Sequence, residues 1–249
     1  MQLHFIKAIY FKIKKTEKDM EKVLVTGASG AIGKSIAEMF LNKGYRVFAG
    51  FNRHPIELDG VTPVFLDVTS PDAVNDAAEK IGGVDILVNN SGISQQKLFS
   101  DITESDWDNM FDVNIKGMFL TTKAFLPHMI HKKSGRIINI SSIWGEVGAS
   151  CEVHYSASKA AVIGFTKALA KELALSGITV NCVSPGMTDT PMNAHLTPED
   201  IAEIESEIPL KRQAKPEEIA DAVYFFASDL SNYTTGQVIS VSGGWNLST

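Results

Sequence analysis

A tyrosine and a lysine four residues apart, Tyr155 and Lys159, are the residues whose types and spacing point most directly to chemistry. They lie in an apolar run from about Val153 to Leu175 that has helical spacing, and a helix places residues i and i+4 on one face. A tyrosine with its ordinary pKa of about 10 is a poor acid–base catalyst, and a neighbouring ammonium group lowers that pKa toward neutrality. The pair therefore predicts proton transfer at an oxygen that is alternately a carbonyl and an alcohol.

Ser142 supplies a third group that fits this chemistry. It follows the strand-like run Arg136–Ile140, where its hydroxyl is placed to hold a carbonyl oxygen. An isolated tyrosine and lysine at this spacing also occur on ordinary helix surfaces, so the assignment depends on the rest of the chain. The neighbouring Cys151 and His154 do not predict a nucleophile and its base, because no acidic residue is placed to orient the histidine. We expect both in the pocket wall.

The composition is that of a soluble globular protein. The chain has 249 residues, of which 44% are hydrophobic and 21% charged, and this length fits one large α/β domain. A formal net charge of -6 argues against nucleic acid as the main partner, and no apolar run reaches the roughly 18 residues that span a membrane. The two cysteines, Cys151 and Cys182, do not have the spacing of metal ligands, and two cysteines are too few for a disulfide framework. We therefore predict a cytoplasmic protein without a metal.

Residues 1–21 differ from the rest of the chain. Apolar side chains between Leu3 and Ile13 are interleaved with lysines, a pattern that a helix on a membrane surface also shows. Met20 begins a compact start for the first strand, which favours an over-long start assignment or a floppy extension. We expect residues 1–21 to be a basic extension, disordered or not native, and residues 22–249 to form a single domain.

A glycine-rich turn follows the first predicted strand. The apolar run Lys22–Thr26 leads into Gly27-Ala-Ser-Gly30-Ala-Ile-Gly33 and then into a helical pattern that ends near Asn42. At such a junction bare amides and the helix dipole face a phosphate, and glycine lets the backbone approach it. The alternative is a plain tight turn. The residues expected to contact a dinucleotide here are Gly27, Ser29, Gly30, Ile32 and Gly33.

The second strand, Arg46–Phe51, decides which dinucleotide is expected. Such a strand often ends in an acidic residue that binds the ribose hydroxyls of NAD, but here Asn52 and Arg53 follow. Arg53 is placed to pair with a 2′-phosphate, which favours NADP(H) over NAD(H); the alternative is a solvated surface arginine. Asp67 and Val68, after the third strand, are further expected contacts, with a turn role for Asp67 as the alternative.

The remaining pattern continues the alternation of strands and helices. The connection from Phe51 to Pro63 is too short for the usual crossover, and we expect a loop in place of its helix. A helix from about Ser105 through Phe125 carries Asn114 in its middle, where a buried asparagine is either a structural bridge or part of a polar site. Residues 187–212 look like a mobile flap over a pocket, with an ordinary surface helix as the alternative. The other expected elements are a helix at 72–80, strands at 85–88, 179–183 and 237–241, and a helix that begins at Pro216.

With these pieces in order, the chain resembles the short-chain dehydrogenase/reductase family over residues 22–245. The matching residues are Thr26-Gly27 with Gly33, Asn89-Asn90-Ser91-Gly92, Asn114, Ser142, the Tyr155–Lys159 pair and Ser184-Pro185-Gly186. The resemblance implies a single-domain Rossmann fold with a doubly wound parallel sheet of seven strands, a nicotinamide cofactor and hydride transfer at a carbonyl carbon. Two departures, Gly30 beside Ala31 and Ser91 for the usual alanine, involve only small residues.

The resemblance also implies a role for each polar residue of the site. Tyr155 is the acid–base residue, and Lys159 lowers its pKa and holds the nicotinamide ribose. Ser142 holds the substrate oxygen, and Asn114 carries a water in the proton relay. Family members commonly form tetramers, so a homotetramer is expected. The cofactor contacts are completed by Asn90, Pro185, Gly186 and Thr188.

Two resemblances within the family point to different substrates. Stretches such as Lys215–Ala220 and Thr235–Gln237 are most similar to the 3-oxoacyl-[acyl-carrier-protein] reductases of bacterial fatty-acid synthesis. Those enzymes grip the acidic carrier with basic residues beside the entrance; Lys133 keeps one such position, whereas Ser176 replaces the other. The stretch Ser141–Val153 instead resembles relatives that reduce a 5-aminopentanone modification on elongation factor P.

The second resemblance gives two residues a role in substrate binding. Trp144 and Glu152 would line the substrate mouth, with Glu152 attracting a cationic amine; the alternative is loop packing and solvation. A different class, a non-catalytic binding protein, is compatible with the same fold. A binding protein has no need to keep the four polar residues of the site together, so the sequence favours a reductase.

Overall fold

Seven strands form one parallel sheet in the part of the chain that this computed structural model describes, residues 20–194 and 196–245. Their order across the sheet is β3-β2-β1-β4-β5-β6-β7. The chain therefore starts in the middle of the sheet, builds to one edge, returns past β1 and continues to the other edge, which is the doubly wound arrangement. The predicted fold class is confirmed, whereas residues 1–19 of the predicted extension lie outside the described residues.

The central strands are short and fully buried. Val23, Leu24 and Val25 in β1 have no exposed surface and pair in register with β2 on one side and β4 on the other. Apolar residues on both faces are what a parallel strand needs when helices cover both sides of the sheet. The strands are β1 (Lys22–Val25), β2 (Arg46–Phe51), β3 (Thr62–Phe65), β4 (Ile86–Asn89), β5 (Gly135–Ile140), β6 (Ile178–Pro185) and β7 (Val238–Val241).

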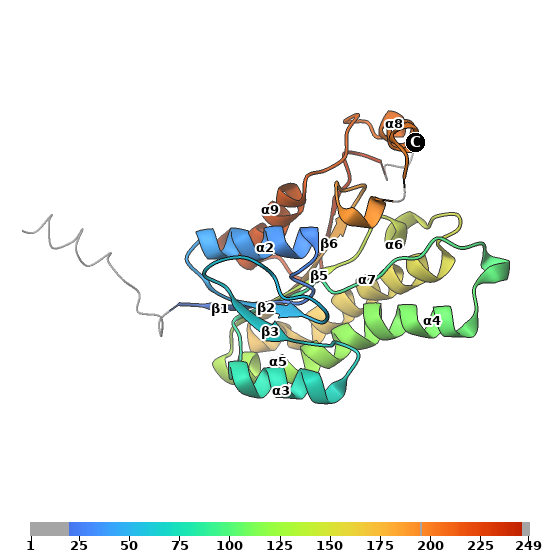
Figure 1. Cartoon of the computed structure of the whole chain (residues 1–249). Coiled ribbons are helices and arrows are strands. Elements are labelled where there is room, and N and C mark those ends of the chain that lie inside the picture. Colours follow the sequence, from blue (N-terminus) through green and yellow to red (C-terminus); the bar gives the residue numbers. More distant parts are fainter. Residues whose placement is uncertain (1–19, 195, 246–249) are drawn as a thin grey trace, which may run out of the picture.

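Helices pack on both faces of this sheet, as Figure 1 shows. Phe40 of α2 and Phe226 of α9 are buried on one face, and Phe125 of α5 and Leu173 of α7 are buried with α3 on the other. No helix within the described ranges combines the length and the apolar character needed to cross a bilayer. The α-helices are α2 (Ala31–Asn42), α3 (Pro71–Ile81), α4 (Glu104–Phe111), α5 (Gly117–Lys132), α6 (Trp144–Val147), α7 (Val153–Leu173), α8 (Pro198–Glu207) and α9 (Pro216–Ala227).

Capping residues fix where the helices that border the site begin. Thr103 and Asp106 form a reciprocal capping box at the start of α4, and Thr197 and Asp200 form another at the start of α8. Each box satisfies backbone N–H groups that a helix leaves without partners in its first turn. The predicted flap, residues 187–212, thus contains a well-defined helix.

The long helix predicted around Asn114 contains a π turn at that residue. α4 and α5 are joined without a break by a π-helical turn, Asp112–Lys116, so the predicted long helix is confirmed and the π turn within it is a feature that the sequence did not indicate. A π turn accommodates an extra residue inside a helix and is frequent at functional sites. The prediction of a loop after β2 is confirmed, because residues 52–61 contain no helix.

Candidate active site

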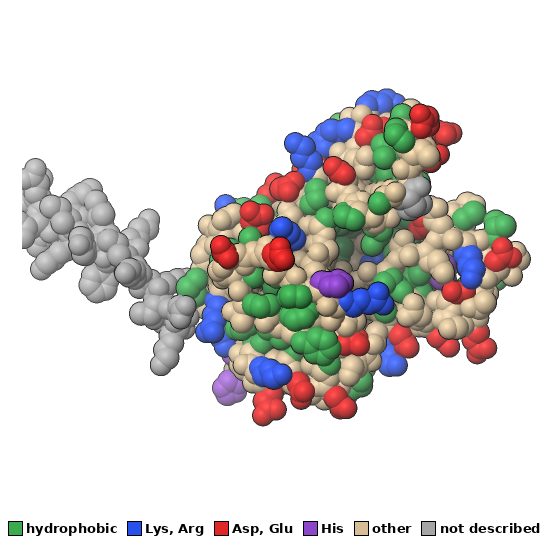
Figure 2. Space-filling view, in the orientation of Figure 1, with side chains coloured by type: hydrophobic (Ala, Val, Ile, Leu, Met, Phe, Trp, Pro, Cys, Tyr) green, Lys and Arg blue, Asp and Glu red, His purple; other side chains and the backbone are tan. Residues whose placement is uncertain are grey.

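A cavity of about 1080 Å³ opens at the carboxyl ends of the central strands. Its wall is formed by the segments that follow β1, β4, β5 and β6 and by part of the segment that carries α8. Figure 2 shows the surface hollowed beneath the lobe that carries α8. Open parallel sheets bind their ligands at this edge, so the cavity lies where the fold places a site.

Most of the site residues proposed from the sequence line this one cavity. Asn114 lies behind its wall, whereas Asn52, Arg53, Asp67 and Val68 lie outside it. The structure therefore brings the glycine-rich turn and the polar residues around Tyr155 to opposite sides of a common space. The lining residues among those proposed are Gly27, Ser29, Gly30, Ile32, Gly33, Asn90, Ser142, Trp144, Glu152, Tyr155, Lys159, Pro185, Gly186 and Thr188.

Hydrogen bonds to the end of β4 hold the glycine-rich turn. Asn90 donates its side-chain amide to the carbonyl oxygens of Thr26 and Gly27, at 3.0 and 3.1 Å. The Thr26 hydroxyl accepts the backbone N–H groups of Asn90 and Ser91, at 3.0 and 2.9 Å. Gly27 has a φ of +62°, and a side chain on Gly33 would lie 2.7 Å from the Asn90 amide nitrogen. The shape of the turn is therefore set before a ligand binds, and it requires glycine at both positions.

The amino end of α2 has the features of an anion site. Gly30 is its N-cap, no side chain caps it, and its first turn carries no acidic residue. The first-turn residues Ala31, Ile32 and Gly33 all line the cavity. Uncapped amides and the positive end of the helix dipole stabilise a pyrophosphate. The residues present thus fit a dinucleotide cofactor.

Ser142, Tyr155 and Lys159 reach the cavity from two elements. Ser142 lies between β5 and α6, and α7 carries the other two residues one turn apart. The Ser142 hydroxyl hydrogen-bonds with Tyr155 and accepts the N–H of Trp144 at 3.2 Å. Lys159 donates to the carbonyl oxygen of Ile140 at 3.0 Å, and its Nζ lies 5.7 Å from the centroid of the Tyr155 ring. This arrangement points two hydroxyl groups and an ammonium group at one region of the cavity.

The pKa values of this group differ from the sequence prediction. Burial raises the pKa of Tyr155 to about 12; the hydrogen bond with Ser142 opposes this rise and the charge of Glu152 adds to it. Burial also lowers the pKa of Lys159 to about 8. The lowering of the Tyr155 pKa by Lys159 is not seen in this structure, where desolvation of the phenolate is the largest cause of the shift. It stays a prediction for the site with its cofactor bound. Tyr155 is therefore a protonated group, suited to donating a proton.

Asn114 supports the cavity wall from the π turn. Its side-chain oxygen accepts the N–H of Ile93 at 2.8 Å, and its amide nitrogen donates to the Ile93 carbonyl at 3.0 Å and to Ser158 Oγ at 2.9 Å. The side chain is buried. Of the two alternatives that the sequence leaves open, the structure shows the structural bridge. The water-relay role stays a prediction.

Gly145 is a site-forming residue that the sequence analysis did not single out. A side chain on Gly145 would lie 2.6 Å from the carbonyl carbon of Lys159 and 2.8 Å from its oxygen. Because Gly145 has no side chain, α6 can approach α7 closely. The Ser141 hydroxyl donates to the same Lys159 oxygen at 2.8 Å. This close approach sets the position of Ser142 relative to Tyr155. A glycine in a short polar stretch carries no signal of such packing, apart from its place three residues after the serine.

Two tryptophans form part of the wall on the substrate side. The rings of Trp144 and Trp245 meet edge to face, with centroids 4.9 Å apart, and both line the cavity. Trp245 Nε1 donates to a carboxylate oxygen of Glu207 at 3.3 Å, which links the C-terminal segment to α8. Met192 and Ile204, from the predicted flap, line the same wall. Trp245 is a further site residue that was not predicted, because a tryptophan after two glycines carries no signal of where the fold places it.

The mouth of the cavity is acidic. A second cavity of about 500 Å³ adjoins it, and Gln96, Leu196 and Ile204 line both. Gln96 donates to a carboxylate oxygen of Glu152 at 3.4 Å. Figure 2 shows acidic side chains at the α8 end of the molecule. The acidic residues that line the second cavity are Asp200, Glu203 and Glu207.

The residues predicted to contact the adenosine lie at the same edge of the sheet but outside the cavity wall. Asn52 and Arg53 are exposed directly after β2. One oxygen of Asp67 accepts both the N–H and the hydroxyl of Thr69, at 2.9 and 2.7 Å. Asp67 thus stabilises a turn, which was the alternative to a cofactor contact. Val68 is buried, and a side chain on Gly117 would clash with it. Contact of these residues with the cofactor stays a prediction.

Two residues expected in the pocket wall are not part of it. Neither Cys151 nor His154 lines the cavity, so that prediction is wrong. His154 is fully buried beside Tyr155 and hydrogen-bonds with Gln95 instead. The first turn of α7 aims successive side chains in different directions, so the neighbour of a lining residue points away from the cavity.

Comparison with known proteins agrees with this geometry. A family model described as enoyl-(acyl carrier protein) reductase matches residues 27–246. The chain is 43% identical over 236 residues to a 3-oxoacyl-[acyl-carrier-protein] reductase of Thermotoga maritima, with 89% of this chain and 96% of that protein covered. It is 42% identical over 236 residues to an uncharacterized oxidoreductase of Bacillus subtilis, with 90% and 98% covered.

A solved structure described as ElxO with NADP bound has the same fold. The two structures have a TM-score of 0.84 at 33% identity, over 91% of this chain and 98% of that chain. A protein of this fold with related sequence therefore binds the class of cofactor that the glycine-rich turn predicts. The chain belongs to the short-chain dehydrogenase/reductase family of NAD(P)-dependent oxidoreductases.

Proposed function

We propose that the protein uses NADPH to reduce a ketone to a secondary alcohol. The observation that supports this is the common cavity in which Ser142, Tyr155 and Lys159 face an uncapped, glycine-rich helix start. The start of α2 would hold the pyrophosphate of such a cofactor, and Tyr155 and Lys159 line the same cavity. When bound, the nicotinamide supplies a hydride to the carbonyl carbon.

The residues of the chain divide the remaining work. The hydroxyl groups of Ser142 and Tyr155 bind the carbonyl oxygen and stabilise the negative charge that develops on it. Tyr155 then transfers its proton to that oxygen, since its raised pKa keeps it protonated at neutral pH. Lys159, which is cationic below a pH of about 8, stabilises the tyrosinate that remains and binds the nicotinamide ribose.

We propose a 3-oxoacyl thioester as the substrate, carried by acyl carrier protein in fatty-acid biosynthesis. The name of the Thermotoga maritima relative supports this class, at 43% identity. The apolar side chains of Met192, Leu196 and Ile204 along the cavity suit an acyl chain. The two positions expected to grip an acidic carrier do not add to this support. Lys133 precedes the amino end of β5, at the edge of the sheet opposite the cavity, and Ser176 is neutral.

A second candidate substrate is the 5-aminopentanone modification on elongation factor P. The acidic mouth favours it, because Glu203 and Glu207 attract a cationic amine and repel an acidic carrier protein. Glu152, on the wall of the main cavity, adds negative charge near the ketone position. Trp144 and Trp245 offer ring faces, which also attract ammonium groups.

Oxidation of NADPH by the purified protein with two substrates tests both candidates. One substrate is an acetoacetyl thioester on acyl carrier protein, and the other is elongation factor P that carries the ketone on its lysine. Fast turnover of the thioester supports the first candidate, and turnover of the modified factor alone supports the second. Turnover of neither, with NADPH bound, would contradict both and leave a reductase of another ketone.

The acidic mouth can be tested separately. The double variant Glu203→Gln/Glu207→Gln is expected to raise KM for the cationic ketone about tenfold and to leave or improve KM for the thioester. Glu199→Gln removes one charge from the same helix at a residue that lines neither cavity, and it is expected to change neither value. Equal effects of the double variant on both substrates would exclude charge recognition at the mouth.

Three further proposals concern the whole protein. We propose that it is a cytoplasmic homotetramer, which sedimentation velocity tests, with a monomer as the contradicting result. We also propose that residues 22–249 are the functional domain. Deletion of residues 1–19 is expected to leave solubility and turnover unchanged, and loss of vesicle binding on deletion would instead support a role at a membrane surface.

A further inference from the structure

A fully buried histidine lies beside the catalytic tyrosine. His154, the second residue of α7, has no exposed surface. Burial lowers its pKa, so the imidazole is neutral at physiological pH. The proposed reaction gives it no task, and it does not line the cavity. A buried ring with two polar nitrogens nevertheless needs hydrogen-bond partners, and these show what it does.

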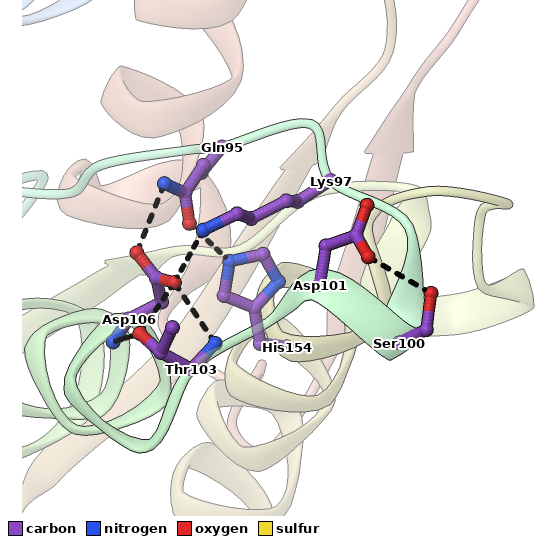
Figure 3. Close-up of polar contacts among 7 residues, drawn as sticks. All are labelled: Gln95, Lys97, Ser100, Asp101, Thr103, Asp106 and His154. Atoms are coloured by element: carbon purple, nitrogen blue, oxygen red, sulfur yellow. Dashed lines mark hydrogen bonds and ion pairs between the residues drawn. The ribbon is translucent and has the colours of Figure 1, made fainter.

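His154 is one end of a chain of hydrogen bonds that runs from α7 to the start of α4, drawn in Figure 3. Its Nε2 lies 2.9 Å from the side-chain oxygen of Gln95. The Gln95 amide nitrogen donates to Asp106 at 3.1 Å. Asp106 also accepts from Lys97 Nζ at 2.7 Å and from the Thr103 hydroxyl at 2.6 Å. This network of hydrogen bonds therefore links three segments that are separate in the sequence.

The charge of Asp106 fixes the direction of each of these bonds. Hydrogen bonds from Lys97, Thr103 and Gln95 hold the pKa of Asp106 far below its ordinary value, so it is a carboxylate and can only accept. Gln95 must then turn its NH₂ group to Asp106 and its oxygen to His154. His154 must in consequence carry its proton on Nε2. Its Nδ1 is an acceptor, buried without a hydrogen-bond partner among the described residues.

The hydrogen-bond network holds the segment 93–97, of which residues 93–96 form one wall of the cavity. Asn114 holds Ile93 at one end, and the N–H of Lys97 donates to the carbonyl of Cys151 at 2.7 Å at the other. Gln95 stands between these anchors and lines the cavity itself. The oxygen and the nitrogen of the Gln95 amide both have hydrogen-bond partners. These bonds fix the side-chain rotamer of Gln95 and with it the backbone of the segment that forms the wall.

We propose that His154 is a positioning residue for the reduction of the ketone: its Nε2–H orients Gln95 and thereby the wall against which the substrate lies. The inference rests on the proposed ketone reduction. His154 touches neither the reacting atoms nor the glycine-rich turn. Its loss is therefore expected to raise KM for the ketone, while kcat and the Kd of NADPH stay as they are. One neutral hydrogen bond corresponds to a change of roughly two- to tenfold.

Glutamine and asparagine variants separate this role from simple packing. A glutamine side chain places its amide nitrogen about where Nε2 lies, whereas asparagine places it about where Nδ1 lies. His154→Gln is expected to keep KM for the ketone close to the wild-type value, and His154→Asn is expected to raise it roughly two- to tenfold. Identical KM values in all three proteins, or an equal rise in both variants, would overturn the proposal. So would a loss of NADPH binding in His154→Asn.

The tautomer gives a second readout that needs no turnover. Nitrogen-15 NMR of the ligand-free protein, with the His154 signals assigned by their absence in His154→Asn, is expected to show a proton on Nε2 and none on Nδ1. A proton on Nδ1 would contradict the orientation of Gln95. A wild-type protein that reduces no ketone would contradict the proposed function, and the positioning role with it. An active wild type with an unaffected His154→Asn variant would contradict this inference alone.

Discussion

The ammonium group of Lys159 donates a hydrogen bond to the carbonyl oxygen of Ile140, 3.0 Å away at the last residue of β5. Lys159 is only 5% exposed. The end of the strand therefore holds a cation in a place where desolvation disfavours charge, and burial lowers its pKa to about 8. Both the activity and the stability of the protein are expected to depend on the charge of this buried ammonium group.

Ketone reduction is expected to slow as the pH rises through about 8. Lys159 loses its charge above that pH, whereas Tyr155, whose pKa burial raises to about 12, keeps its proton. The dependence is measured as kcat/KM between about pH 6 and about pH 10. In Lys159→Arg the cation does not titrate in this range. The kcat/KM that this variant retains is therefore expected not to fall as the pH rises through about 8. A decline at the same pH in this variant would assign it to another group.

Removal of the buried cation is expected to stabilise the ligand-free protein. Between the folded pKa of about 8 and the ordinary value of 10.5, the unfolded chain binds a proton that the folded chain does not, so stability rises with pH. Below about pH 8 the folded protein carries the whole free-energy cost of burying the Lys159 ammonium group. Lys159→Met is therefore expected to raise the free energy of unfolding at neutral pH by up to about 3 kcal/mol, and to abolish turnover.

Denaturant unfolding measures this change. Lys167→Met, at an exposed position of the same helix, is the matched control and is expected to change the free energy of unfolding by no more than about 0.5 kcal/mol. A less stable Lys159→Met protein would mean that the hydrogen bond to Ile140 outweighs the desolvation of the ammonium group.

Removal of the Tyr155 hydroxyl is expected to stop the chemistry without releasing the cofactor. Tyr155→Phe lacks the proton donor, so kcat should fall about 100- to 10,000-fold. The glycine-rich turn is untouched, and the Kd of NADPH should stay within about threefold of the wild-type value. Single-turnover rates and fluorescence titration of NADPH measure the two effects. Retained turnover would show that another group donates the proton.

The charge after β2 is expected to set the preference for NADPH. Arg53 is exposed at the carboxyl end of β2, where no acidic residue replaces it. Arg53→Asp should weaken NADPH binding about tenfold or more and strengthen NADH binding, because a carboxylate repels the 2′-phosphate and accepts from ribose hydroxyls. Lys80→Asp makes the same change of charge in α3 as a control. An unchanged ratio of kcat/KM values for the two cofactors would place recognition elsewhere.

A methyl group on Gly33 is expected to disturb the cofactor site. It would lie 2.7 Å from the Asn90 amide nitrogen and 2.9 Å from the Cα of Ala28, so the turn must move. Gly33→Ala should therefore raise the Kd of NADPH at least tenfold and lower the free energy of unfolding by about 1–3 kcal/mol. Gly164→Ala, in α7, meets no atom within 4 Å and should be neutral or slightly stabilising. Equal behaviour of the two variants would contradict the close fit.

Residue type and spacing were enough to predict the sheet and one side of the site. The buried apolar runs and the glycine-rich turn determine the parallel sheet and the anion site, since both depend on local sequence. The i, i+4 spacing brings Tyr155 and Lys159 together because helical geometry is regular. Trp245 could not be predicted in the same way: it reaches the cavity only because β7 places Trp245, a few residues after the strand, beside Trp144 of α6.

Burial was the second property that the sequence did not reveal. The spacing of Tyr155 and Lys159 is compatible with either sign of the pKa shift, and the sign depends on how completely water is excluded from the phenol. Similarly, nothing in the type of His154 indicates that it lies behind the wall rather than in it. Its partner Gln95, and Asp106, which accepts from Gln95, come from a part of the chain about fifty residues away, and only the fold brings them together.

The π turn at Asp112–Lys116 makes the site depend on chain length as well as on side-chain chemistry. Deletion of a single residue there would allow a regular α-helix to run through, and each side chain on one side of the deletion would rotate about 100° around the helix axis relative to the other side. The amide of Asn114 would then turn away from Ile93. An insertion or deletion of one codon, with every polar residue of the site intact, would therefore be as damaging as the substitution of Asn114 itself.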